Sequence, residues 1–200
     1  MRGNLSSFVG VVRCQGGAAL AGGSVAVVVL SRVLPLAPVR VIGRPDVRTV
    51  VWPLVPALIA LAVPIGAVTR FAAWTWVAAR PGWQVRSAFI AAVAVVSTVT
   101  VAVVGLDRVV VARNLALFIG LALLGVAVLG RPPWGLLVGL PTVVWFTGVD
   151  PPDAVRWWAV PLLPADHVGA ALVAGATATV GIAAHIALPP RWSLVHVRRR

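Results

Sequence analysis

The side chains that could carry out acid–base or metal chemistry are few: five aspartates and three histidines in 200 residues. Asp150 and Asp153 lie in one polar stretch, and His167 follows Asp166 directly. Carboxylates can bind divalent cations, and a carboxylate with an imidazole can transfer protons. However, Asp150 and Asp153 have no His or Cys neighbour, and no phosphate-binding loop or metalloprotease motif occurs. We therefore predict no catalytic residues, metal or cofactor. A membrane enzyme in which these loop residues converge is a third hypothesis, behind the two given below.

His185 is the one titratable group well inside the last apolar stretch of the chain. An ionisable side chain in a membrane helix is by default a candidate functional group. His185 also lies about one turn before Pro189, where a neutral, hydrogen-bonded imidazole is the simpler interpretation. We keep it as a candidate intramembrane polar site, with the structural reading favoured.

The elements that would position these groups are set by the charge pattern. The chain has 22 charged residues, 17 basic and five acidic, and almost all of them lie between six apolar stretches. A charge at the centre of a membrane helix costs roughly 2.5–3.5 kcal/mol on insertion scales. The pattern therefore predicts an all-α, polytopic bundle forming a single membrane domain over residues 1–200. The six predicted spans are residues 17–34, 50–69, 87–106, 114–130, 134–149 and 168–188.

Two of these spans are irregular. The second contains Pro56 and Pro64, so we expect a kinked helix. Such a kink can line a substrate path or simply serve the packing of neighbouring helices, and we favour the packing interpretation. The fifth has 16 positions, about 24 Å of helix against a hydrocarbon core of about 30 Å, and is interrupted by Pro141. Five spans with a re-entrant segment are the alternative to six.

The connecting segments carry further predictions. Residues 70–80 are expected to form a short interfacial helix, or an extension of the second span. Val39–Ile42 could form a short extended segment. Asn114 is a plausible N-cap for the fourth span.

Small residues recur at a spacing of four on several predicted helices. These pairs are Gly135/Gly139, Ala171/Gly175 and Thr177/Gly181. Small side chains allow membrane helices to approach closely. We expect these faces to pack within the chain or against a homo- or hetero-oligomeric partner.

The net charge of +12 would suggest nucleic acid in a soluble protein. Here the arginines flank apolar spans, so we expect contact with the lipid bilayer and no nucleic acid. With six spans and cytoplasmic termini, ten arginines would lie inside and seven outside, which favours that orientation in the plasma membrane. The first stretch reads as an uncleaved signal-anchor rather than a cleaved signal peptide. Residues 189–200 form a basic C-terminal tail.

From Arg80 onward the order of features resembles a known family. Arg80-Pro-Gly-Trp-Gln-Val-Arg86 leads into a Val/Ala span, Arg113-Asn114 opens a Gly/Leu span, and Trp157-Trp158 with Pro161-Leu-Leu-Pro-Ala-Asp166 precedes the last span. This order is similar to that of actinobacterial six-span membrane proteins that look like permease subunits of ATP-binding-cassette exporters. The resemblance covers about half of the chain.

The resemblance implies that the chain is a transport subunit whose ATPase is a separate protein, because no ATPase motif occurs here. It also implies that the segment containing Arg70, Arg80 and Arg86 contacts that partner. The alternative is a non-transporting membrane scaffold or accessory subunit, which the lack of buried charge and the small-residue faces favour. Fold-level likeness does not fix function.

Overall fold

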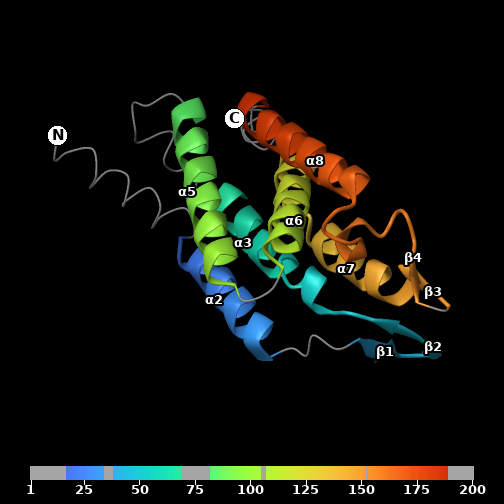
Figure 1. Cartoon of the computed structure of the whole chain (residues 1–200). Helices are drawn as coiled ribbons and strands as arrows, with labels where there is room; N and C mark the ends of the chain where they lie inside the picture. Colours follow the sequence, from blue (N-terminus) through green and yellow to red (C-terminus); the bar gives the residue numbers. More distant parts are fainter. Residues whose placement is uncertain (1–16, 34–37, 69–81, 105–106, 152, 189–200) are drawn as a thin grey trace.

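The chain is mostly helical in a computed structural model that describes residues 17–33, 38–68, 82–104, 107–151 and 153–188 (Figure 1). Two small β-hairpins and two short 3-10 helices join the helices. The prediction of a helical fold is thus confirmed. Within the described residues, the α-helices are α2 (Gly17–Val33), α3 (Ala57–Val68), α5 (Gly82–Val103), α6 (Arg108–Leu129), α7 (Trp134–Thr147) and α8 (Val168–Ala187).

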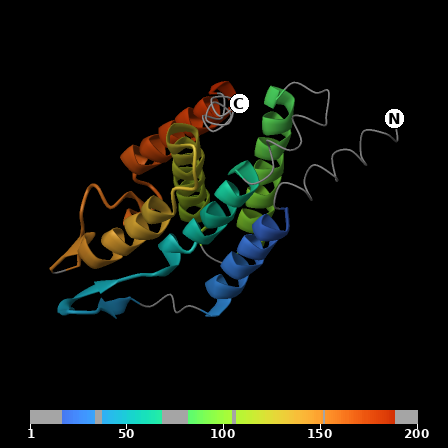
Figure 2. The same ribbon diagram turned by 180° about the vertical axis from the view of Figure 1, so that it is seen from behind.

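The three longest helices, α5, α6 and α8, form one unit around α6. Phe118 and Leu123 of α6 have no exposed surface, which fits the central place of this helix in both views (Figures 1 and 2). Its packing on α8 depends on glycine, because a Cβ at Gly120 would lie 2.6 Å from the carbonyl oxygen of Thr177. A Cβ at Gly181 would in turn collide with the backbone of Gly120. The backbones therefore touch where α6 and α8 cross.

The shorter helices α2, α3 and α7 complete the bundle, with α3 packed on α6, α2 and α7. A Cβ at Gly23 of α2 would lie 3.3 Å from the Cα of Ile59 in α3, so these two helices also approach closely. Pro64 lies inside α3 and Pro141 inside α7, as predicted for the two irregular stretches. Ile59 is fully buried, so α3 is part of the apolar core.

Two antiparallel hairpins project together from one side of the bundle (Figure 1). The first pairs β1 (Val39–Val41) with β2 (Arg44–Thr49), which confirms an extended segment at this place. Its turn uses Gly43 at φ +80°, a backbone region that glycine adopts without steric cost. The second, which the sequence analysis did not predict, pairs β3 (Val149–Asp150) with β4 (Ala154–Val155). Strand β2 contacts β3.

Several predicted boundaries are wrong. Helix α6 begins at Arg108, because Asp107 accepts hydrogen bonds from the amides of Val109 and Val110 at 2.9 and 3.2 Å as its N-cap. Asn114 therefore lies in the second turn and is not a cap. Helix α5 begins at Gly82 rather than Ser87. The start of the second stretch is split off, because Trp52–Leu54 forms a 3-10 helix, η1, before α3.

Three helices in the described ranges are long and apolar enough to cross a membrane: α5 over Arg86–Val103, α6 and α8. Helices α2, α3 and α7 have 17, 12 and 14 residues and are shorter than a full crossing. The predicted interfacial helix at 70–80 and the basic tail at 189–200 lie outside the described residues.

Candidate functional site

A buried arginine and its neighbour form the most extensive polar network seen in the described part of the chain. Arg113 is 6% exposed and Asn114 is fully buried, although both lie on the apolar helix α6. Their partners come from the loop before α8, where Val160–Leu162 forms a second 3-10 helix, η2, and from Pro53 in η1. The network therefore joins three segments that are far apart in the sequence.

Backbone carbonyls supply nearly all of its acceptors. Arg113 donates from Nη1 to Pro164 at 2.8 Å and from Nη2 to Leu163 at 2.7 Å, with a longer contact to Pro161 at 3.4 Å. Its Nε donates to the side-chain oxygen of Asn114 at 3.2 Å. A buried charge is costly unless hydrogen-bonded, and carbonyl dipoles here offset that cost.

Asn114 completes the connection between the loop and η1, the 3-10 helix that precedes α3. Its amide nitrogen donates to the carbonyl oxygens of Pro53 at 2.8 Å and Pro161 at 2.9 Å. One side chain thus holds η1 and η2 together against α6. The arrangement is a clamp between segments. Its donors are directed at carbonyls of the chain, which makes it suited to fixing geometry rather than to transferring protons.

Arg86 and His185, two residues singled out from the sequence, lie at the same end of the α5–α8 pair. Nη1 of Arg86 donates to the carbonyls of His185 and Ile186 at 3.1 Å each and of Leu188 at 2.6 Å. It thereby satisfies carbonyls at the end of α8 that have no partner within the helix. The ring of Phe89 lies 6.2 Å from that of His185.

These contacts give both residues a role inside the chain. His185 is 6% exposed and packs beside Phe89, where α5 meets α8. The Nη1 group of Arg86 is engaged in hydrogen bonds to the end of α8. Arg70 and Arg80, predicted to act with Arg86, lie outside the described residues.

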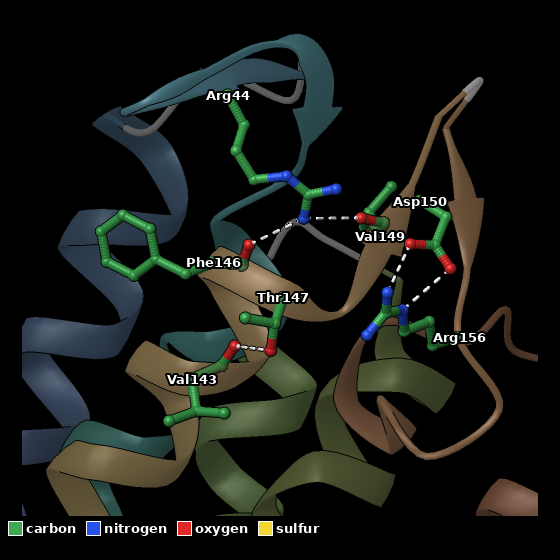
Figure 3. A network of polar contacts seen from close by, with 7 residues as sticks. All are labelled: Arg44, Val143, Phe146, Thr147, Val149, Asp150 and Arg156. Carbon is green, nitrogen blue, oxygen red and sulfur yellow. Dashed lines mark hydrogen bonds and ion pairs between the residues drawn. The ribbon is translucent and has the colours of Figure 1, made fainter.

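The two hairpins are held to each other and to α7 by a separate polar network (Figure 3). Arg44 donates to the carbonyls of Phe146 at 3.1 Å and Val149 at 3.2 Å. Its guanidinium therefore lies at the C-terminal end of α7. Asp150 and Arg156 form a two-pronged ion pair at 2.6 and 2.8 Å across the second hairpin. The hydrogen bond from Arg156 lowers the pKa of Asp150 below its usual value.

Two of the remaining residues considered for metal or acid–base chemistry, Asp153 and His167, have structural partners. Asp153, at φ +74°, accepts from the amide of Arg48 at 2.9 Å. Nδ1 of His167 accepts from the amide of Ala170 at 3.1 Å and caps α8. Across the described ranges, His, Cys, Asp and Glu nowhere gather in a group of three or more that could hold a metal ion.

Helices α5, α6 and α8 also line an open cleft of about 470 Å³. Its walls are apolar except for two hydroxyl-bearing residues, Ser97 and Thr98 of α5. The cleft lies beside the Gly120 crossing, which brings the backbone of α8 against α6. Ligand sites are commonly concave and apolar with few polar groups, and their volumes fall in the same range. The lining residues are Ile90, Val93, Ala94, Ser97, Thr98, Val101, Ala112, Leu115, Ala116, Ile119, Gly120, Leu123, Ala178 and Ile182.

The sequence analysis missed the network of Arg113 and Asn114, because it placed both at the membrane boundary. The signal that could have located it is Asp107 followed by Arg108-Val-Val, an N-cap with the first turn of a helix. From that start, Arg113 and Asn114 fall on the second turn. The cleft had no comparable signal, because apolar residues on separate helices do not reveal how the helices pack.

Comparisons of the chain with protein-family models, with curated proteins and with solved structures give no match.

Proposed function

We propose that the chain is a multi-pass protein of the cell membrane. The supporting observation is that α5, α6 and α8 are each long and apolar enough to cross a bilayer. Apolar side chains on their outer faces favour the same placement: Val95 is 64%, Val99 56% and Leu172 68% exposed. A water-soluble fold would leave such a surface in contact with solvent at a cost of roughly 25 cal/mol per Å².

We propose that the shorter helices α2, α3 and α7 also enter the bilayer, which gives six membrane segments with α5, α6 and α8. At 1.5 Å per residue, the 17 residues of α2 span about 26 Å, and the 14 residues of α7 about 21 Å. These lengths are below the core thickness of about 30 Å, so local thinning or partial insertion accompanies them. Outward apolar side chains on both helices support their contact with lipid, including Val29 at 52% and Val138 at 54% exposure.

The termini lie in the cytoplasm in this proposal, as the ten-to-seven arginine count favours. Three of the seven outside arginines have acceptors within the protein: Arg44, Arg113 and Arg156. Arginines engaged in this way are less available to anionic headgroups. On the inside, Arg86 is engaged in the same way, so the proposed orientation rests on the ten-to-seven count.

The biochemical role proposed is that of a permease-like subunit of a transporter driven by a separate ATPase. The observation that carries it is the apolar cleft of about 470 Å³ between the three longest helices, a space suited to an apolar substrate. The resemblance to exporter permeases adds the partner. Arg70, Arg80 and Arg86 remain candidates for the partner contact, with Arg86 also holding the end of α8.

Copurification from the native membrane in mild detergent tests this role. The tagged chain is expected to recover a protein with ATP-binding-cassette motifs in fixed proportion. Arg80→Gln is expected to weaken that recovery, whereas Arg108→Gln, an exposed residue at the opposite end of α5–α6, is the matched control and should leave it unchanged. Recovery of the chain alone, or equal recovery with both variants, would contradict the proposal.

The alternative is a scaffold or accessory subunit that acts through helix contacts. It is favoured by Gly135 and Gly139 of α7, where a Cβ would meet no atom within 4 Å. This small-residue face is open to a partner helix. Gly139→Leu should then disrupt a complex seen by native electrophoresis, while Gly22→Leu, equally open on α2, should not. Loss of transport with the complex intact would count against a purely structural role.

A further inference from the structure

Two arginines lie directly opposite each other on the first hairpin. The register pairs Arg40 of β1 with Arg48 of β2 across the antiparallel ladder, so their side chains leave the same face of the hairpin. The amide of Arg48 donates to Asp153 at 2.9 Å and therefore points away from β1. The two arginines thus form a non-hydrogen-bonded pair, the kind in which opposed residues stand closest, with Cα atoms about 4.5 Å apart.

The packing of the hairpin turns this face outward. Both neighbours of Arg48 in β2 are buried, Val47 at 1% and Thr49 at 4% exposure, whereas Arg40 and Arg48 are exposed. Successive strand residues point to opposite faces, so the inner face packs against the protein and the arginine face is open. The bond to Asp153 also ties β2 to the second hairpin, which lies beside the first (Figure 1). The arginine pair therefore stands on a hairpin whose position is set.

The positive charge of the pair is not neutralised within the described residues. The ion pair found there joins Arg156 and Asp150, and neither guanidinium group of Arg40 and Arg48 has a carboxylate within ion-pair distance. Like charges placed directly opposite each other destabilise a sheet. The first hairpin carries three arginines against one aspartate, Asp46, which gives a net charge of +2. An anion bound between the two guanidinium groups would remove their repulsion.

Phosphate suits such a pair, because each planar guanidinium can donate two parallel hydrogen bonds to its oxygens. Short connections keep the pair near lipid headgroups. Strand β3 begins at Val149, two residues after α7 ends, and the headgroup layer is about 5–8 Å thick on each side of the hydrocarbon core. Ile42, in the turn of the first hairpin, is 73% exposed, and Trp157, just after the second, is 82% exposed. Exposed apolar and tryptophan side chains beside arginines are typical of the membrane–water interface.

We propose that Arg40 and Arg48 together bind the phosphate of an anionic phospholipid. The proposal rests on the membrane location given above and does not depend on the transport role. Phosphatidylcholine carries its phosphate beside a fixed positive charge, so it binds more weakly than a lipid without one. Free inorganic phosphate offers the same oxygens without acyl chains, and the experiment separates it from the lipid.

Native mass spectrometry of the full chain in detergent tests the site. The probe is dioleoyl phosphatidylglycerol, with dioleoyl phosphatidylcholine as the comparison, and the fraction of protein carrying one lipid is measured against lipid concentration. The original chain is expected to bind phosphatidylglycerol more tightly, by about fivefold for each arginine that meets the phosphate. A large molar excess of sodium phosphate should leave the bound phosphatidylglycerol in place.

Single substitutions locate the site. Arg40→Gln and Arg48→Gln should each lower the affinity for phosphatidylglycerol about fivefold and leave that for phosphatidylcholine unchanged. Arg108→Gln, the matched control, removes the same charge from an exposed arginine outside the hairpins and should alter the affinity by less than about twofold. Asp46→Asn should raise the affinity, because it removes the acid of the first hairpin. Among the described residues the side chain of Arg40 takes part in no hydrogen bond or ion pair, so its replacement leaves the contacts of the fold intact.

Equal affinity of the original chain for the two lipids would overturn the proposal, as would a loss with Arg108→Gln as large as that with Arg40→Gln. Displacement of the lipid by sodium phosphate would overturn it in favour of a free anion. Alkaline extraction of the native membrane tests the location separately, and the original chain and Arg40→Gln should both stay with the membrane. Release of both would remove the membrane location and this site with it, whereas retention of both with equal lipid affinities would remove this site alone.

Discussion

Nη2 of Arg113 in α6 donates to the carbonyl oxygen of Leu163, fifty residues further along the chain, at 2.7 Å. The bond belongs to a network that ties α6 to the segment leading into α8. An arginine in an otherwise apolar helix thus forms hydrogen bonds to the backbone of a neighbouring loop. This relationship sets the first prediction, because the guanidinium is the donor to a carbonyl in a buried part of the loop.

Replacing Arg113 with Met should lower the free energy of unfolding by about 2–4 kcal/mol, since the carbonyl of buried Leu163 and the side-chain oxygen of buried Asn114 lose their bond to the guanidinium. Thermal unfolding in detergent, followed by tryptophan fluorescence, measures the change. Arg108→Met is the control, because Arg108 is exposed at the start of the same helix. Equal stability of the two variants would show that water replaces the guanidinium without cost.

Asn114→Ala should also destabilise the chain, by about 1–3 kcal/mol, because its amide donates to both Pro53 and Pro161. Combined with Arg113→Met, the effects should be less than additive, since the two side chains bond to each other and share Pro161. A double-mutant cycle with the same unfolding measurement provides the coupling. Strict additivity would mean that the two residues act independently.

Gly120→Ala and Gly181→Ala should each destabilise the crossing of α6 and α8 by about 1–3 kcal/mol, because the added methyl group meets backbone that cannot move aside. Gly175→Ala, in α8 like Gly181, is the matched control, because its new Cβ would have no atom within 4 Å. It should be neutral or slightly stabilising, since alanine favours helix over glycine. Unfolding midpoints compare the three, and a loss at Gly175 equal to that at Gly181 would refute the argument.

The ion pair of Asp150 and Arg156 predicts a dependence on pH. Because the folded pKa of Asp150 is depressed, the pair stabilises the hairpin above the ordinary aspartate pKa of about 3.9 and loses that effect as pH falls through the folded value. Carbon-13 NMR of the labelled aspartates should show Asp150 titrating below its usual range. Arg156→Gln should move that titration upward, and no change between the two would exclude the pair as its cause.

Arg86→Gln should loosen the end of α8, because three carbonyls near His185 and Leu188 lose their donor. Amide hydrogen exchange over the last turn of α8 should accelerate by about tenfold, the effect of losing roughly 1.4 kcal/mol of local stability. Arg131→Gln, an exposed arginine after α6, is the control and should not alter exchange there.

How far the sequence predicts the structure depends on what holds each element. Apolar runs with little charge locate the six α-helices of the described residues, since their length and composition require no knowledge of partners. Predicted helix boundaries are wrong where a residue type fits two structural roles. Asn114 is an example, because asparagine is common at N-caps, whereas here it bonds to η1 and η2 from within α6. The β3–β4 hairpin has strands of two residues and depends on the contacts of Asp150 and Arg156, so no periodic pattern marks it.

The candidate site follows the same division. His185 was singled out as a titratable group in a predicted span and Arg86 through the resemblance to exporter permeases, but their meeting depends on how α5 packs against α8. The small-residue spacing at Thr177/Gly181 indicated a close approach and located one, against Gly120. The equivalent spacing at Ala171/Gly175 gives no contact at Gly175 within the described residues. Spacing identifies surfaces that permit approach, whereas the partner surface decides which of them is used.

The clamp at Arg113 has one further consequence, for genetic tolerance. Its acceptors are main-chain oxygens apart from the side chain of Asn114, so the loop residues that receive the hydrogen bonds contribute no side-chain chemistry to it. A saturation mutagenesis screen would therefore find Pro164, an exposed acceptor residue, permissive to any residue that keeps the path of the loop. The donors Arg113 and Asn114 would tolerate almost no substitution. Fitness would therefore depend on the identity of the donor residues and hardly on that of the acceptor residues.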